Sequence, residues 1–258
     1  MCHIGSMGGW QPRVGRPLLP GPARVLAGWV TAGCAVLVAA LGVLFAHQGT
    51  ADGFDRAIDA PVIGWLSGQP HLRLWLAFPG TLKPATVLVI AAAAGCILAG
   101  RLGGALLAAA AVPVATGLDE ALLKPLVDRT YLGNLAYPSG HVTTVSALAA
   151  TATVLLAIPP QQAGTRLPRV LLTAVAWAVT VVVAVAVMSL RWHYFTDTIA
   201  GAAVGVGTTA ALGLLIDLPV VRRVLGRLCR ARPGAVAGPD PSRLSSADSP
   251  PTERRSQS

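Results

Sequence analysis

Six runs of apolar residues divide the chain, and its polar residues gather in the segments between them. A helix that crosses the hydrocarbon core of a bilayer needs ~20 apolar residues, and the runs approach or reach that length. We expect spans at residues 25–46, 85–100, 102–123, 142–158, 170–190 and 198–216. In the last run, Gly201 and Gly205 form a pair of small residues that would allow close helix packing. The pattern predicts an all-α fold, an integral membrane bundle of six transmembrane helices.

The segments outside the runs have a different character. Residues 47–82 mix charged positions with short aromatic-containing patches, which is typical of an extramembrane loop with interfacial helices. Residues 1–22 are rich in Gly, Pro and Arg without apolar periodicity, and we interpret them as a disordered cytoplasmic leader. Residues 218–258 are first basic and then rich in Pro and Ser, which predicts a basic and then disordered cytoplasmic tail. The membrane domain is therefore expected over residues 23–217.

Composition and charge agree with a membrane protein. The chain is 53% hydrophobic and only 12% charged, against about 25% charged in soluble domains. With the N-terminus in the cytoplasm, 14 of the 20 Lys and Arg residues fall in cytoplasmic segments and six fall outside. This asymmetry follows the positive-inside rule. It predicts a multi-pass protein of the plasma membrane, surrounded by lipid, with both termini cytoplasmic. The net charge of +9 is thus a topology signal and not a sign of nucleic-acid binding. No pattern in the chain indicates an oligomeric state.

The most unusual polar stretch lies between the third and fourth runs. Lys124 and Arg129 follow the third run, and a Pro-Ser-Gly-His turn ending at His141 leads into the fourth. Ser139 is a candidate helix N-cap, and amides near Gly140 at a helix N-terminus favour an anion. The two cations would neutralise phosphate oxygens as charge develops on them. We expect Lys124, Arg129, Ser139 and Gly140 to bind phosphate at the outer membrane face, and His141 to protonate the leaving group.

A second polar cluster lies between the fifth and sixth runs and contains Arg191, His193 and Asp197. Residues four apart share one face of a helix, so we expect the Asp197 carboxylate to orient the His193 ring. His193 is then the candidate nucleophile, and Arg191 a further candidate for binding phosphate. The four cysteines lack metal-ligand spacing and the chain has no aspartate cluster, so we expect neither a metal nor another cofactor.

These motifs resemble a known family. Lys124 with Arg129, the Pro-Ser-Gly-His turn and His193-x-x-x-Asp197 are similar to the three signature blocks of the type 2 phosphatidic acid phosphatase superfamily, which includes the vanadium haloperoxidases. The resemblance extends over roughly residues 82–216. It implies a six-helix bacterial membrane phosphatase that acts on a lipid phosphate substrate through a phosphohistidine at His193. It also implies polyprenyl diphosphates, such as the cell-wall carrier, as the first substrate choice. Phosphatidic acid or phosphatidylglycerol phosphate comes next.

The chain departs from the family pattern at two places. Tyr131 and Leu132 stand where the first block usually has Arg-Pro, and Ala186 and Val187 stand where the third usually opens with Ser-Arg. Arg191 is our candidate to supply the missing positive charge. The departures motivate an alternative function, a weak or inactive relative that binds lipid phosphate or serves as a membrane scaffold. A transporter is disfavoured, because the candidate charges lie at the ends of the spans and not at the membrane midplane.

Overall fold

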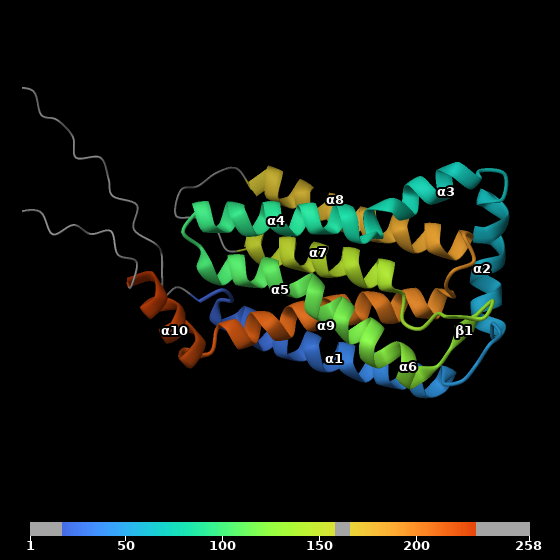
Figure 1. The fold of residues 1–258 in the computed structure, drawn as a ribbon, viewed down its shortest axis with the longest axis horizontal. Helices are drawn as coiled ribbons and strands as arrows, with labels where there is room; N and C mark the ends of the chain where they lie inside the picture. The colour runs from blue at the N-terminus through green and yellow to red at the C-terminus, as the bar shows by residue number, and fades with distance from the viewer. Residues whose placement is uncertain (1–16, 158–165, 231–258) are drawn as a thin grey trace, which may run out of the picture.

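The long helices lie side by side in a bundle that is elongated along one axis (Figure 1). The structure, a computed structural model, describes residues 17–157 and 166–230. The bundle consists of α1 (Gly21–Phe45), α4 (Leu82–Leu98), α5 (Leu102–Leu118), α7 (Gly140–Ala157), α8 (Arg166–Ser189) and α9 (Phe195–Ile216). The predicted all-α membrane bundle is thereby confirmed.

Shorter elements connect these helices. They are α2 (Gly53–Leu66), α3 (Pro70–Ala77), the 3₁₀ turn η1 (Phe78–Gly80), the π-helical turn η2 (Asp119–Leu123), α6 (Lys124–Val127), α10 (Pro219–Arg230) and the antiparallel strands β1 (Thr130–Tyr131) and β2 (Asn134–Leu135). α3, η1 and α4 follow one another as a single apolar stretch, and so do α5, η2 and α6. Within residues 47–82 the structure therefore has two helices, α2 and α3, ahead of the second long helix.

Five of the described helical stretches are long and apolar enough to cross a membrane, and α7 contains a shorter apolar helix, Gly140–Leu156. These six stretches coincide with the six runs in the sequence. The largest difference is in the second, which begins at Pro70 instead of residue 85 because α3 and η1 continue into α4. Which side of the membrane each end faces stays a prediction.

The last residues of the expected leader are packed against the bundle. The backbone N–H groups of Leu18 and Leu19 donate to the two carboxylate oxygens of Asp217 at 2.6 and 2.8 Å. Arg24 pairs with the same carboxylate at 3.4 Å. Residues 17–22 are thus held in place, contrary to the expected disorder, and α10 begins two residues after Asp217. The rest of the leader, 1–16, and the tail from 231 onward lie outside the described residues.

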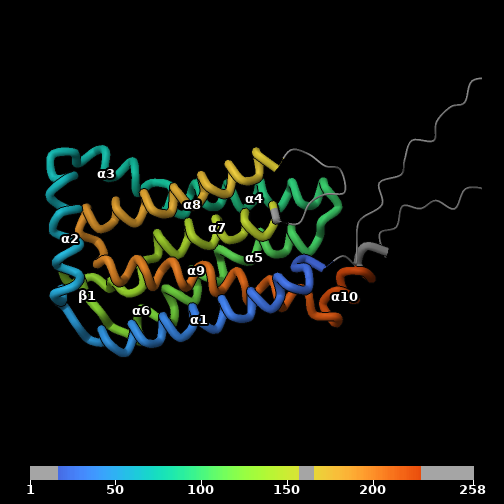
Figure 2. The backbone as a smooth tube through the Cα atoms, turned by 180° about the vertical axis from the view of Figure 1, so that it is seen from behind, coloured from blue at the N-terminus to red at the C-terminus, as the bar shows by residue number. Residues whose placement is uncertain are grey.

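The two ends of the bundle differ. α2 lies across the ends of the long helices, as both views show (Figures 1 and 2), and the β1–β2 hairpin lies at the same end. The Asp52 carboxylate accepts the N–H of Asp55 at 2.6 Å and so caps the start of α2. α10 is at the opposite end (Figure 1). The start of α7, which carries His141, and the segment before α9, which carries His193, are therefore at the α2 end.

The interior contacts of α7 explain one departure from the family pattern. Val142 and Val145 on α7 pack with Val183, Ala186 and Val187 on α8, and all five side chains are buried. Ala186 and Val187, at the positions where the family has Ser-Arg, are thus core residues that stabilise the contact between α7 and α8.

α9 packs closely against α7 because two glycines face it. A methyl group added at Gly201 would lie 2.5 Å from the carbonyl oxygen of Ser139, and one added at Gly205 would lie 2.6 Å from that of Thr143. Real carbon atoms do not approach so closely, so only glycine permits this packing. The glycine pair in the last run therefore holds the start of α7 against α9.

Replacing Gly205 with Ala should force α7 and α9 apart and destabilise the folded protein by about 1–3 kcal/mol, as overpacking does. Gly33→Ala on α1 is the matched control, because a methyl group there meets nothing within 4 Å. Thermal unfolding in detergent measures both variants. Equal melting temperatures for the two would contradict the close packing.

Candidate active site

A cavity of about 1220 Å³ opens at the α2 end of the bundle, between η1, α4, α5, the β1–β2 hairpin and the segment before α9. Five of the eight predicted site residues line it: Lys124, Gly140, His141, Arg191 and His193. The other three, Arg129, Ser139 and Asp197, are fully buried and outside the lining. The two histidines and two cations thus share one cavity, although they come from segments about 50 residues apart.

His193 lies in the short connection between α8 and α9 and is only 6% exposed. Its Nδ1 is 2.7 Å from the carbonyl oxygen of Ala136. A carbonyl oxygen can only accept, so Nδ1 carries the proton and the lone pair is on Nε2. Burial lowers the pKa of His193 to about 3, and the nearby positive charge of Lys124 acts in the same direction. The ring is therefore neutral at pH 7, the form in which Nε2 is a nucleophile.

Asp197 does not orient His193 in this structure, contrary to expectation. Its carboxylate accepts the N–H of Tyr194 at 2.9 Å and pairs with Arg129 at 2.7 Å. The spacing of four places two side chains on one face only inside a helix, and His193 precedes α9, which begins at Phe195. The partner that the sequence did not reveal is the Ala136 backbone carbonyl, which has no side-chain signature.

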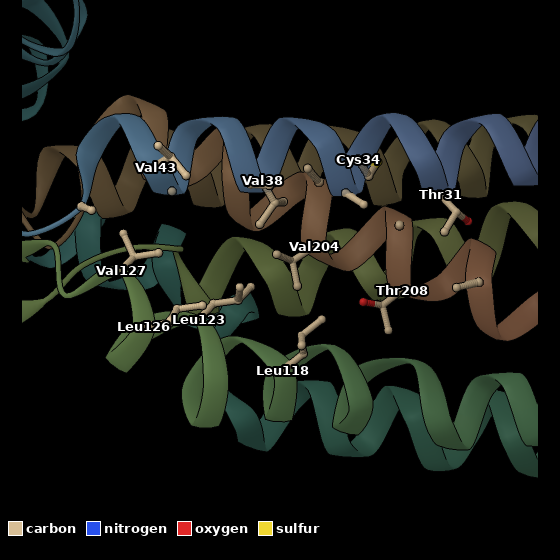
Figure 3. Close-up of a pocket in the computed structure, with 17 residues that line it drawn as sticks. Thr31, Cys34, Val38, Val43, Leu118, Leu123, Leu126, Val127, Val204 and Thr208 are labelled. Atoms are coloured by element: carbon tan, nitrogen blue, oxygen red, sulfur yellow. The ribbon is translucent and has the colours of Figure 1, made fainter.

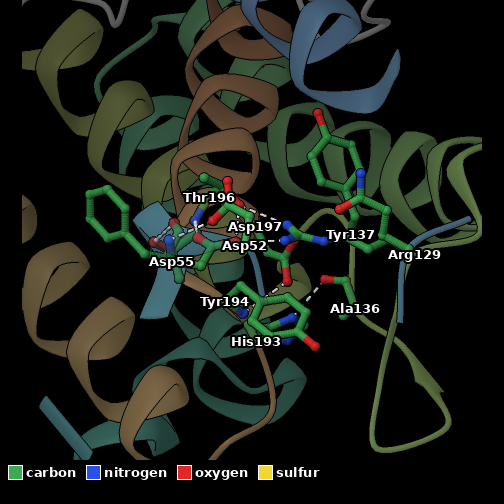
Figure 4. A network of polar contacts seen from close by, with 12 residues as sticks. Asp52, Asp55, Arg129, Ala136, Tyr137, His193, Tyr194, Thr196 and Asp197 are labelled. Carbon is green, nitrogen blue, oxygen red and sulfur yellow. Dashed lines mark hydrogen bonds and ion pairs between the residues drawn. The ribbon is translucent and has the colours of Figure 1, made fainter. Parts of the chain in front are cut away.

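Arg129 is the centre of a buried ionic network (Figure 4). Its guanidinium forms ion pairs with Asp55 on α2 and Asp197 on α9, and it donates to the Thr196 hydroxyl at 2.7 Å. The guanidinium carbon also lies 4.1 Å from the ring centroid of Phe45 and 4.3 Å from that of Tyr194. Both carboxylates and the arginine are fully buried. Arg129 thus lies outside the cavity lining, with its charge compensated by two carboxylates.

The Pro-Ser-Gly-His turn starts α7, with Ser139 at the N-cap position and Gly140 as the first helical residue. The N–H of Ser139 donates to the carbonyl oxygen of Asp197 at 3.0 Å, which joins this turn to the start of α9. The Ser139 hydroxyl is buried and has no hydrogen-bond partner among the described residues. The His141 ring lies beside that of Trp192, with centroids 5.4 Å apart. Ser139 thus positions the turn through its backbone, and His141 reaches the cavity.

Lys124 enters the cavity together with an acidic neighbour. Its Nζ is 2.6 Å from Oε1 of Glu120, one turn earlier. A methyl group at Gly140 would lie 2.8 Å from the same oxygen, so the Glu120–Lys124 pair lies directly against the start of α7. Glu120 also lines the cavity, which the sequence did not indicate. The π-helical turn η2 contains Glu120 and shifts the register just before Lys124.

Tyr131 also lines the cavity, at the position where the family has an arginine. Its ring packs on that of Tyr194, with centroids 4.3 Å apart. Burial raises the pKa of Tyr131, while the charge of Arg191 acts to lower it. Arg191 lines the same cavity as Tyr131, and its role in binding phosphate stays a prediction.

Two further observations concern other possible sites. Among the described residues, no group of three or more His, Cys, Asp or Glu side chains is arranged to hold a metal ion. A second cavity, of about 640 Å³, lies between α1, α9 and the α5–α6 region (Figure 3). Its lining is apolar apart from Thr31, Cys34 and Thr208 and contains no charged side chain. This second cavity therefore lacks the groups needed for phosphoryl chemistry.

Known proteins resemble this chain in part of its sequence and in its fold. Residues 113–217, which contain all eight predicted site residues, match the model of the PAP2 superfamily. A crystal structure described as the first transmembrane PAP2 type phosphatidylglycerolphosphate phosphatase from Bacillus subtilis superposes with a TM-score of 0.57 at 17% identity. The match covers 71% of this chain and 94% of that one, and it supports the fold. No curated protein matches the chain. Residues 113–217, which hold the predicted site residues, are thus similar to the PAP2 superfamily, and the chain has the helical fold of a membrane protein of that type.

Proposed function

We propose that the protein is a membrane lipid phosphatase that cleaves a phosphate monoester or diphosphate through a phosphohistidine at His193. The observation that carries this proposal is the shared cavity, in which neutral His193, His141 and Lys124 meet. A histidine fixed by a carbonyl at Nδ1 has one reactive nitrogen, and a second histidine can transfer protons.

In the proposed first step, the Nε2 lone pair of His193 attacks phosphorus and the bond to the lipid oxygen breaks. Protonated His141 donates its proton to the departing oxygen. The imidazole gains positive charge as the P–N bond forms, and the Ala136 carbonyl dipole stabilises it through the Nδ1–H bond. In the second step His141 takes a proton from water, whose oxygen attacks phosphorus and breaks the P–N bond. The products are inorganic phosphate and either the lipid alcohol, from a monoester, or the lipid monophosphate, from a diphosphate whose terminal phosphorus is attacked.

Lys124 and Arg191 are the cations proposed to bind the non-bridging oxygens, helped by the amides at the start of α7 near Gly140. For Lys124 to do so, phosphate must displace Glu120 from its side chain. Arg129 and Asp197 do not line the cavity, and we propose that they act by positioning the segments that contain the two histidines. With these charges we propose that turnover is independent of metal ions.

A lipid substrate is supported by the composition of the cavity. Besides the charged groups, the lining includes apolar side chains, among them Leu82, Val89, Val112 and Leu190. These residues belong to helices long enough to span a membrane or lie directly after one, so a lipid chain can lie along them. Polyprenyl diphosphates remain our preferred substrates, followed by phosphatidic acid and phosphatidylglycerol phosphate. The last is the substrate named for the structural neighbour.

We propose a plasma-membrane location with the site on the extracytoplasmic side and both termini in the cytoplasm. The arginines of α10, Arg222, Arg223 and Arg227, are at the end of the bundle opposite the cavity (Figure 1). The positive-inside rule assigns this basic end to the cytoplasm.

The alternative, a relative that binds lipid phosphate without cleaving it, is favoured by two observations. Glu120 occupies Lys124 in the cavity, and Tyr131 replaces a family arginine. Such a protein would bind vanadate or phosphate but release no phosphate from any lipid.

Purified protein in detergent with EDTA should release phosphate from at least one lipid of a panel of polyprenyl diphosphate, phosphatidic acid and phosphatidylglycerol phosphate. His193→Ala should abolish turnover because the nucleophile is lost. His71→Ala on α3 is the control, since His71 is exposed and outside the cavity. Wild type that is no faster than His193→Ala on every lipid would refute the enzyme and favour the alternative.

The lowered pKa of His193 also predicts how stability depends on pH. The unfolded chain binds a proton at His193 below its ordinary pKa of about 6.5, whereas the folded protein binds it only near pH 3. Stability must therefore fall as pH decreases from 6.5 towards 3. His193→Gln removes this contribution, so its melting temperature should fall less steeply than that of wild type between pH 7 and pH 5. Parallel curves of melting temperature against pH for wild type and His193→Gln would show that the folded protein does not hold His193 neutral.

A further inference from the structure

α2 contributes two carboxylates to the site, although it lies outside the residues that match the family model. We propose that Asp55 is a positioning residue for the reaction: it fixes Arg129, and through Arg129 it fixes the two turns that carry His141 and His193. The inference rests on the proposed function, because it assigns Asp55 a role in the same reaction.

The contacts of Asp55 use both oxygens of its carboxylate. Oδ2 pairs with Arg129 and accepts the Thr196 hydroxyl at 3.0 Å. Oδ1 accepts the backbone N–H of Thr196 at 3.0 Å. This amide is in the first turn of α9, where helical N–H groups lack partners inside the helix. Asp55 is fully buried. Its carboxylate compensates the charge of the buried Arg129 and accepts a hydrogen bond from a backbone N–H at the start of α9.

Arg129 transmits this position to His193 through its own backbone. The Arg129 carbonyl oxygen accepts the N–H of Ala136 at 2.8 Å, closing the loop that contains the β1–β2 hairpin. The Ala136 carbonyl oxygen in turn accepts Nδ1–H of His193 at 2.7 Å. A shift of Arg129 would therefore move the group that selects the tautomer and direction of the His193 ring.

The side chain of Arg129 transmits the position to the other turn. It pairs with Asp197 at 2.7 Å, and the Asp197 carbonyl oxygen accepts the N–H of Ser139 at 3.0 Å. Ser139 precedes Gly140 and His141 at the start of α7. One guanidinium thus connects both histidines of the site to α2.

Removing one partner of a buried ion pair leaves a charge that the interior cannot solvate. Without Asp55, Arg129 would keep a single carboxylate and would be free to shift towards Asp197. A misplacement of about 1 Å in a catalytic group can cost ~10²-fold in rate. The expected defect is therefore in the chemical step and not in the binding of substrate, because Asp55 does not line the cavity.

Asp59 is a matched control on the same helix. It is one turn after Asp55, 6% exposed, and its carboxylate accepts the N–H of Phe195 at 3.1 Å. Among the described residues it forms no hydrogen bond or ion pair with Arg129. Asp55→Asn and Asp59→Asn thus each replace a carboxyl group near the start of α9 with an amide of the same size, but only the first touches the connection to His193.

The experiment compares kcat, KM and melting temperature of wild type, Asp55→Asn and Asp59→Asn on the lipid that wild type turns over fastest. Because mispositioning acts on the rate, Asp55→Asn should lower kcat by at least ~10-fold per folded molecule with KM within about threefold. Asp59→Asn should keep kcat within about threefold. If Asp55→Asn does not fold, Thr196→Val replaces it. That change removes the hydroxyl between Asp55 and Arg129 at equal volume, and kcat should again fall at constant KM.

The possible outcomes separate the two proposals. If wild type turns over and Asp55→Asn, or Thr196→Val in its place, retains kcat like Asp59→Asn, the positioning role is refuted and the phosphatase stands. The same holds if the loss appears in KM alone. If wild type shows no turnover on any lipid, the proposed function fails and this inference fails with it.

Discussion

The active-site end of the protein depends on the burial of one charged group, the guanidinium of Arg129. A buried cation is tolerated only where opposite charges and hydrogen bonds replace water. Here Asp55 and Asp197 provide the charges, Thr196 provides a hydroxyl, and two aromatic rings cover the guanidinium. The carboxylates come from α2 and α9, far from each other in the chain. The arginine can be buried only when these segments are assembled, so the formation of the cavity and the burial of this charge are coupled.

Close helix packing supplies the second constraint. Gly201 and Gly205 allow the first two turns of α7 to lie directly on α9, which places the Ser139 carbonyl within reach of α9's backbone. The histidines then occupy neighbouring positions because each belongs to the beginning of one of these two helices or precedes it. The packed helices thus support the site, and the ionic network around Arg129 fixes the segments that contain His141 and His193. We propose that a phosphate bound there contacts Lys124, Arg191 and the amides at the start of α7, and that its lipid chain contacts the apolar part of the lining.

The sequence predicts the bundle well because apolar run length directly reports membrane-spanning helices. Of the eight site residues that we selected from the sequence, five line one cavity, since their motifs lie at the ends of the spans. It cannot reveal partners that depend on backbone geometry: the group that holds His193 is the carbonyl of Ala136, a residue with no polar side chain. Nor does it indicate Asp55, which meets Arg129 across 74 positions of chain. From the sequence, Arg129 resembled a phosphate ligand. Its spacing from Lys124 does not show whether the Arg129 side chain faces the cavity or the interior.

In the proposed reaction, Nε2 of His193 carries the phosphoryl group during turnover. The most direct measurement is to quench the enzyme with alkali during hydrolysis of a lipid labelled in its phosphate, and to locate the label by mass spectrometry of peptides. Phosphate on the peptide that contains His193, stable in alkali and lost in acid, is the predicted result, and it should be absent from His193→Ala. Label on His141, or turnover with no labelled histidine at any quench time, would contradict the account.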